Sequence, residues 1–354
     1  MVGLSRQIEL IRAQASGCRS LGSPFYAHLL EQVADDVAAG GPSAAVLAGH
    51  EDAPGPSALA LRLMAAVHRL VLTGRDPGLA AHYPSAGGTG DAASAWPAFR
   101  EVLTEHREFI RAGLASAPQT NEVGRSAALF GGLLQVLSRA QQPDRPVRLV
   151  EIGASAGLNL LADHFTYRVA DGNTWPPSGG STAPAPTGGP QPAPVVLDPA
   201  WESWPLGIPD GVEVVERLGC DLAPIDARSQ EGALSLLSCV WPDQTHRLDR
   251  LRGALALAQE HAVTLERAGG GDFLDRLALA EGRHTVVAAA PSRPRRTPPF
   301  RRRGHHLARW HGAAARRGAT ARGAGALGRP HALIARLAPS GPCARLVAWL
   351  TTRW

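Results

Sequence analysis

The chain of 354 residues contains no lysine, so all 36 of its Lys and Arg residues are arginines. This absence excludes enzymes that form a Schiff base through a lysine, including those that anchor pyridoxal phosphate, and the P-loop, whose lysine contacts phosphates. Aromatic residues are also scarce, at 5% of the chain. The hydrophobic content of 44% is still enough to form a sizeable core, and the length favours two domains.

Cysteines and long apolar runs are few as well. The four cysteines do not have the spacing of a disulfide framework or a zinc site, so we expect free thiols and no bound metal. No window of about 18 apolar residues is free of charge, which excludes a membrane span. Arg6, Glu9 and Arg12 interrupt the N-terminal segment, which is therefore not a signal peptide. We expect a cytoplasmic protein.

Acidic residues are missing from one end of the chain. Residues 288–354 contain 14 arginines and no Asp or Glu, whereas residues 1–287 contain 22 arginines and 31 acidic residues. The net charge of +5 is therefore the sum of a negatively charged body and a positively charged tail. The tail lacks helical or strand periodicity, so we expect it to be irregular or disordered. It is the part that would contact nucleic acid or other acidic partners.

The spacing of apolar residues divides the body into two parts. Over residues 1–143 they recur at three- and four-residue steps, which predicts a helical domain. After Pro146 short β-branched runs alternate with helical segments, as in a parallel sheet. We assign residues 144–290 to a Rossmann-like domain with a Pro- and Gly-rich inserted loop at 171–199, and residues 291–354 to the tail. The predicted fold class is α/β.

The most specific motif of the sequence joins a predicted strand to a glycine turn. The run LVEIGASAGLNL, residues 149–160, has Glu151 two residues before Gly153, and Gly157 four residues after it. A dinucleotide site needs G-x-G-x-x-G, but Ser155 stands at the second glycine position, which disfavours a pyrophosphate ligand. The pattern resembles the first motif of class I S-adenosylmethionine-dependent methyltransferases. The alternative is an unliganded strand-turn-helix of an α/β fold.

The methyltransferase resemblance implies a set of cofactor-binding residues. S-adenosylmethionine carries no phosphate, and Glu151 would meet its ammonium group, directly or through water. The rest of the turn, with Asn159, would lie along the amino-acid portion: Gly153, Ala154, Ser155 and Gly157. Acidic residues after the next two predicted strands would bind ribose hydroxyls and the adenine amino group: Asp221, Asp226 and Asp272. The alternative for these three is that they are turn and N-cap aspartates.

A second polar motif, QTNEVGR, occupies residues 119–125. One interpretation is a helix cap, with Thr120 or Asn121 as the N-cap and Arg125 paired with Glu122. The other is that this helix start closes over the carboxylate of the cofactor, with Arg125 as the counter-ion. His68 lies in an apolar helical segment and is expected to be structural. The sequence identifies neither a general base nor a methyl acceptor.

Several segments together resemble the bacterial family called domain of unknown function 2332, over about residues 1–287: GSPFYAHLL, QTNEVGRSAAL, VEIGASAGLNLL and VWPDQTHRLDRL. The family has no established activity to carry over. The resemblance implies a helical N-terminal part, a methyltransferase-like layer and a cytoplasmic bacterial protein. The basic tail departs from the expected continuation. We therefore hypothesise that the reading frame shifts near Val287.

Two functions stay open at this point. The first is an S-adenosylmethionine-binding protein, which would be a methyltransferase of unknown acceptor if it is active. The second is a non-catalytic Rossmann-like binding or scaffold module, whose basic tail contacts nucleic acid or acidic partners.

Overall fold

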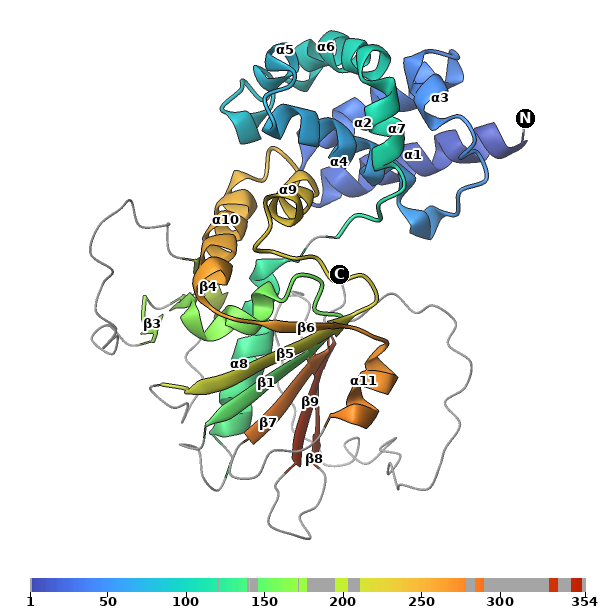
Figure 1. Ribbon diagram of the computed structural model, residues 1–354. Helices are drawn as coiled ribbons and strands as arrows, with labels where there is room; N and C mark the ends of the chain where they lie inside the picture. Colours follow the sequence, from blue (N-terminus) through green and yellow to red (C-terminus); the bar gives the residue numbers. More distant parts are fainter. Residues whose placement is uncertain are drawn as a thin grey trace, which may run out of the picture.

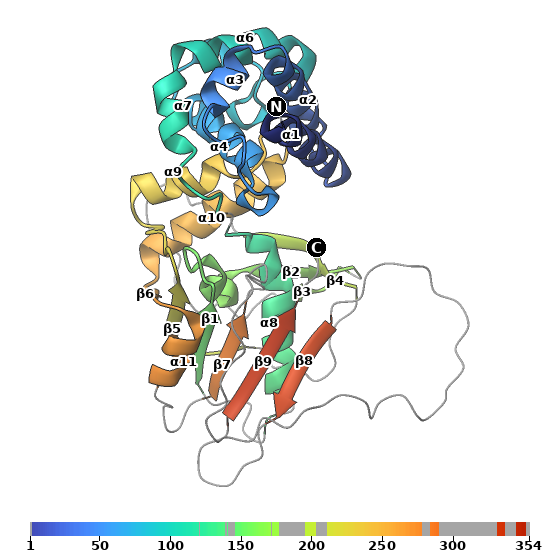
Figure 2. The same ribbon diagram turned by 90° about the vertical axis from the view of Figure 1, so that its right-hand side faces the viewer.

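The computed structural model describes residues 2–119, 121–138, 140, 146–170, 172–176, 195–202, 211–277, 284–289, 331–336 and 345–351. Within these residues a helical body stands above a sheet layer, and helices α9 (Gln230–Ser238) and α10 (Thr245–Glu260) lie between the two (Figures 1 and 2). The mixed α/β class predicted from the sequence is confirmed at this level.

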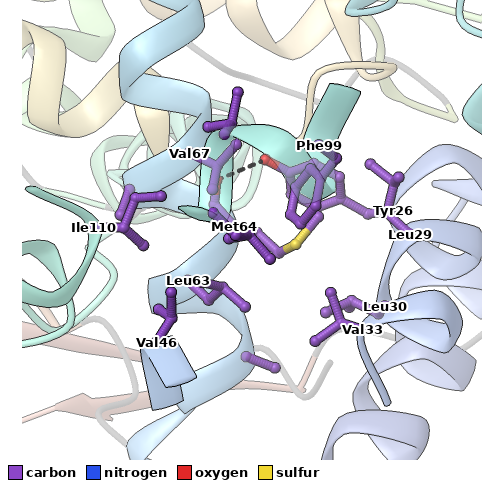
Figure 3. Close-up of a cluster of buried hydrophobic side chains, with 14 of the residues drawn as sticks. Tyr26, Leu29, Leu30, Val33, Val46, Leu63, Met64, Val67, Phe99 and Ile110 are labelled. Atoms are coloured by element: carbon purple, nitrogen blue, oxygen red, sulfur yellow. Dashed lines mark hydrogen bonds between the residues drawn. The ribbon is translucent and has the colours of Figure 1, made fainter. Parts of the chain in front are cut away.

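The helical body has one core of its own. Its helices are α1 (Val2–Ser20), α2 (Pro24–Ala38), α3 (Pro42–Leu47), α4 (Leu59–Leu72), α5 (Pro77–Ala80), α6 (Ala92–Glu105) and α7 (Arg107–Gly113), with 3-10 turns η1 (Gly55–Ser57) and η2 (Pro84–Ala86). Figure 3 shows Leu29 and Leu30 of α2 facing Leu63 and Met64 of α4, all fully buried. The three- and four-residue spacing in the sequence produced this buried face.

The main sheet has the strand order β6-β5-β1-β7-β9-β8. Its strands are β1 (Val147–Ile152), β5 (Val214–Asp221), β6 (Thr264–Arg267), β7 (His284–Ala289), β8 (His331–Arg336) and β9 (Arg345–Thr351). Strand β1 pairs in parallel with both β5 and β7, β6 and β9 extend the parallel part, and β8 is antiparallel to β9. The chain therefore builds outward from β1 to β6 and then crosses to the other side of β1.

Helices cover both faces of this sheet. The 3-10 turn η3 (Val123–Arg125), α8 (Ser126–Leu137), the 3-10 helix η4 (Leu158–His164) and α10 contribute to one core with β1. Helix α11 (Gly270–Arg276) packs on the other face, where Phe273 meets Val150 and Val287. The predicted helical domain ends at residue 143, but α8 belongs to the core of the sheet. The segment after the glycine turn, predicted to be helical, forms a 3-10 helix rather than an α-helix.

Strands occur in two segments that were predicted to be irregular. Within the predicted loop at 171–199, β3 (Thr174–Trp175) and β4 (Val196–Trp201) pair with β2 (Thr166–Val169), and the rest of that loop, at 171 and 177–194, lies outside the described residues. Trp175 is buried against Phe130 and Tyr167. In the predicted tail, β8 and β9 form strands, and residues 291–330, 337–344 and 352–354 lie outside the described part. The apolar runs of β8 and β9 are short and are flanked by arginine, glycine and proline, so the sequence did not indicate strands there.

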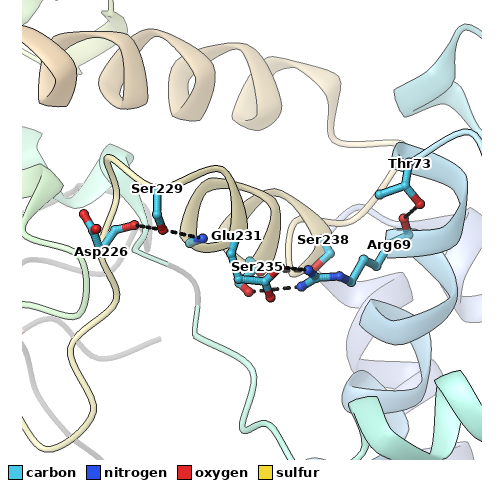
Figure 4. A network of polar contacts seen from close by, with 8 residues as sticks. Arg69, Thr73, Asp226, Ser229, Glu231, Ser235 and Ser238 are labelled. Carbon is cyan, nitrogen blue, oxygen red and sulfur yellow. Dashed lines mark hydrogen bonds and ion pairs between the residues drawn. The ribbon is translucent and has the colours of Figure 1, made fainter.

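Polar contacts connect the helical body to α9. Arg69 of α4 pairs with Glu231 and donates to Ser235 Oγ at 3.2 Å (Figure 4). His68 is fully buried, with Nδ1 donating to the carbonyl of Ser238 at 3.1 Å and Nε2 lying 2.8 Å from Ser85 Oγ. Burial lowers the pKa of His68 to about 4. The structural role predicted for this histidine matches its contacts.

Asp243, between α9 and α10, also forms hydrogen bonds with the helical body. Its Oδ1 accepts from Ser23 Oγ at 2.6 Å and its Oδ2 accepts from the Phe25 amide at 3.0 Å, at the start of α2. We expect Asp243→Ala to lower the free energy of unfolding by about 1 to 3 kcal/mol, because two polar groups lose a charged acceptor. Urea denaturation measures this. Asp249→Ala, an exposed carboxylate of α10, is the control and should change stability by less than about 0.5 kcal/mol.

No helix in the described part of the chain combines the length and the apolar character needed to cross a membrane.

Candidate functional site

The chain leaves β1 through a turn with three residues in the left-handed region. The φ angles are +73° for Gly153, +55° for Ser155 and +75° for Gly157. A Cβ atom on Gly157 would lie 2.8 Å from Val263 Cγ1, so both the backbone angle and the packing require glycine there. The amides of Gly153 and Ala154 donate to the Cys220 carbonyl at 2.8 and 3.0 Å, which ties the turn to the end of β5.

Side chains of the QTNEVGR motif bind this turn. Asn121 is buried, and its Oδ1 accepts from the amides of Ala156 at 3.0 Å and Leu158 at 3.1 Å. Gln119 Oε1 accepts from Ser155 Oγ at 2.9 Å. The QTNEVGR motif and the glycine turn, which are separate in the sequence, are therefore in direct contact. Side chains of QTNEVGR stabilise the conformation of the turn.

Asp221 completes the hydrogen bonding of the turn. Its Oδ2 accepts from the Ser155 amide and its Oδ1 from the Ala223 amide, both at 2.9 Å. The amide of Ser155, a predicted cofactor-binding residue, and the neighbouring amides of Ala156 and Leu158 thus donate to side chains of the chain itself.

The N-cap residue of η3 is Glu122 rather than the predicted Thr120 or Asn121, and no ion pair joins Glu122 to Arg125 within the described residues. Glu122 accepts from the Gly124 amide at 3.1 Å and pairs with Arg247 of α10. Asn121 caps the distant glycine turn instead of its own helix, because its side chain reaches Ala156 and Leu158. Thr120 lies outside the described residues.

Glu151, one of the predicted cofactor-binding residues, is a buried acid. Its side chain extends from β1 into the core, and the residue is 2% exposed. Asn159 Nδ2 donates to Glu151 Oε1 at 3.3 Å, and Ser126 Oγ donates to Asn159 Oδ1 at 2.9 Å. Burial raises the pKa of Glu151 to about 8, against the opposing effects of Asn159 and Arg125. The carboxyl group is therefore mostly protonated at neutral pH.

Two buried atoms at this place have no hydrogen-bond partner in the described part of the chain: Glu151 Oε2 and Arg125 Nε. The guanidinium of Arg125 acts on Glu151 electrostatically, but no ion pair joins them within the described residues. An unpaired buried polar atom is unfavourable, and such atoms need an explanation such as a bound water, ion or ligand.

Glu151 also lines a small cavity of about 20 Å³ between β1, β7, α8 and η4. The rest of its wall is mostly apolar: Leu129, Phe130, Leu133, Leu149, Asn159, Leu160, Ala162, Val286, Val287 and Ala288. This volume holds one water molecule. The cavity lies where the strand order reverses between β1 and β7, and open α/β sheets bind ligands at the carboxyl ends of the strands at such a reversal.

The remaining predicted acids do not join this group. Asp226 is exposed in the loop before α9, where its carbonyl accepts from Ser229 Oγ (Figure 4). Asp226 is one of the residues that line a second pocket, of about 310 Å³. Asp272 lies in the first turn of α11, and no hydrogen bond or ion pair within the described residues joins it to another predicted site residue. Helix α11 covers the face of the sheet opposite α8, which separates Asp272 from Glu151.

Sequence reasoning missed a group of polar residues near that second pocket. Arg217 of β5 pairs with Asp163 and donates to His164 Nε2 at 3.0 Å. The His164 ring stacks on His261, with ring centroids 3.7 Å apart. These residues come from three separate elements, so no local spacing could have indicated them.

Three acid or imidazole groups also approach one another in the helical body. Asp76, Glu105 and His106 bring one potential metal-ligand atom each within 4.8 Å of one another. Asp76 already accepts from the Leu79 amide as the N-cap of α5. Proximity alone does not assign a metal to this group.

Comparisons with known proteins place the chain in a family but add no activity. No curated protein and no solved structure matches the chain. A family model described as an uncharacterized protein conserved in bacteria, DUF2332, matches residues 8–329. The match continues beyond Val287, further than the resemblance over residues 1–287. The hypothesis of a frame shift there stays a prediction, which translation of the other two reading frames of the gene would test. The chain belongs to the DUF2332 family of bacterial proteins.

Proposed function

We propose that the chain binds S-adenosylmethionine in the crevice between the carboxyl ends of β1 and β7. The observation that carries this proposal is a pair of buried atoms without a hydrogen-bond partner in the described part of the chain: Glu151 Oε2, whose residue lines the cavity, and Nε of Arg125, whose charge acts on Glu151. The strand order β6-β5-β1-β7, with all four strands parallel, supports a doubly wound arrangement of the methyltransferase type.

The charges of these two residues suit a zwitterion. The amino-acid end of S-adenosylmethionine carries an ammonium and a carboxylate. Glu151 would release its proton to solvent when the ligand binds and would then bind the ammonium, and Arg125 would bind the carboxylate through charge-assisted hydrogen bonds. The amino-acid end of this ligand has one charge of each sign and therefore provides a partner for both atoms, while the sulfonium is a further positive charge outside this pair.

The arrangement also limits how the ligand binds. The amides of the glycine turn already donate to Asn121 and Asp221, so Arg125 is the carboxylate-binding group in this proposal. The cavity beside Glu151 holds only a water, so binding requires the apolar side chains of α8 that line it, such as Leu129 and Leu133, to move. Methyl transfer would then need mainly alignment of an acceptor with the methyl group. No residue of this chain is assigned as a base.

A second candidate is the non-catalytic module with a basic tail. Its support is that the chain's own side chains satisfy the glycine turn, so the turn does not depend on a ligand for its shape. Its nucleic-acid contact would come from the 14 arginines of residues 288–354.

Thermal unfolding distinguishes the two candidates. We expect S-adenosylmethionine and S-adenosylhomocysteine at 100 times their Kd to stabilise the protein by about 2.7 kcal/mol, since ligands that bind only the folded state shift the equilibrium. Binding to mixed-sequence DNA at two salt concentrations is measured in parallel. DNA binding that weakens with salt, together with no shift from either nucleoside, would favour the scaffold.

A further inference from the structure

The pocket of about 310 Å³ lies on the other side of η4 from Glu151. Leu160 and Ala162 of η4 line the small cavity, whereas Leu158 and Leu161 line this larger pocket. Its apolar walls also come from the loop after β5, from α10 and from the start of β6: Pro224, Ile225, Ala227, Ala258, Val263 and Leu265. A pocket of this size, with mostly apolar walls and a few polar groups, is typical of small-molecule sites.

His261 gives one wall of this pocket an aromatic ring. The ring stacks on His164 with an interplanar angle of 21°. Arg217 donates to His164 Nε2 at 3.0 Å, which fixes that imidazole as a neutral acceptor. Burial, and then the charge of Arg217, lowers the pKa of His261, so its ring is neutral at pH 7 as well. A neutral stacked pair extends readily to a third flat ring.

Asp226 and Arg228 supply the charges of the pocket. Asp226 Oδ1 accepts from the Arg228 amide at 3.0 Å, and both residues are exposed and line the pocket. The guanidinium of Arg228 donates to the Gln259 carbonyl at 3.4 Å. One carboxylate and one guanidinium leave the lining without net charge, so it does not favour an anion. The carboxylate is an acceptor for the N–H or O–H groups of a ligand.

We propose that this pocket binds a nucleoside, with its base stacked on His261 and its N–H or hydroxyl donors bound by Asp226. A flat nitrogen heterocycle uses the imidazole face, the aliphatic walls and the carboxylate together, whereas a purely aliphatic ligand would leave Asp226 and His261 without a role. The pocket does not include Glu151, so the inference stands apart from the proposed S-adenosylmethionine crevice.

Calorimetric titration of the full chain with adenosine tests the proposal. We expect His261→Ala to weaken adenosine binding roughly tenfold, because base–aromatic stacking is lost. His261→Phe keeps a stacking ring and should bind within about threefold of the wild type. Asp226→Asn should weaken binding about fivefold or more, while the matched control Asp249→Asn should leave it unchanged.

Two results would overturn the proposal. One is the absence of heat with adenosine, guanosine and cytidine up to about 5 mM, which excludes even weak binding. The other is adenosine binding that His261→Ala and Asp226→Asn leave unchanged. If His261→Ala fails to fold, as judged by its thermal unfolding, His261→Phe and Asp226→Asn decide the question. Loss of adenosine binding in Glu151→Gln, with retention in His261→Ala, would instead place the nucleoside in the β1–β7 crevice.

Discussion

Replacing Glu151 by glutamine is expected to stabilise the protein at alkaline pH and to leave its stability unchanged near pH 4. Burial raises the pKa of Glu151 from 4.5 to about 8, so the folded state holds a proton that the unfolded state releases between these values. The stability that this group contributes is therefore complete below pH 4.5 and is lost as the pH rises through 8. Glutamine stays neutral throughout, and its Oε1 can accept from Asn159 as the carboxyl does.

Urea denaturation at pH 4.5, 7 and 9 measures this difference. We expect the variant to exceed the wild type by ~2 to 4 kcal/mol at pH 9, the order of magnitude that a pKa raised by a few units implies. Glu9→Gln, an exposed carboxylate on α1, is the control and should show no such trend. Equal stability of Glu151→Gln and wild type at pH 9 would mean that the buried carboxyl ionises without penalty.

Replacing Asn121 by alanine is expected to produce the second large effect, a loss of about 2 to 4 kcal/mol. The substitution removes the acceptor of the Ala156 and Leu158 amides in a buried place, and each unsatisfied amide is unfavourable by roughly 1 to 3 kcal/mol. The turn also contains Ser155 in the left-handed region, which its surroundings must hold.

Chemical denaturation of Asn121→Ala and Asn121→Asp at pH 7 separates the acceptor from the volume of the side chain. Aspartate keeps an acceptor oxygen in the same position and should retain more of the stability than alanine does. If alanine proves as stable as the wild type, the QTNEVGR segment does not hold the glycine turn.

The sequence predicted those parts of the fold that local spacing determines. The helical character of the first 113 residues and the strand before the glycine turn, β1, follow the expected pattern, because their apolar residues repeat with the period of the element. Strands β3, β4, β8 and β9 were missed. They are short and lie beside proline, glycine or arginine, which dominate the local composition.

The residues of the candidate site could be proposed from the sequence, but the contacts between them could not. Asn121 and the glycine turn were both identified, but their hydrogen bonds join residues 35 and 37 positions apart. Such a contact depends on the path of α8 between the two motifs. Asp272 matched the expected spacing, but its helix covers the opposite face of the sheet. Spacing along the chain does not specify the face on which a helix packs.

Calorimetric titration with S-adenosylhomocysteine is the most direct test of the ligand assigned to Glu151 and Arg125. We expect the wild type to bind this nucleoside and Arg125→Ala to bind it at least about tenfold more weakly, because the carboxylate loses its charge-assisted partner. Arg252→Ala, an arginine of α10 paired with Asp249, should bind like the wild type. No measurable heat with the wild type, or equal affinity in Arg125→Ala, would contradict the assignment.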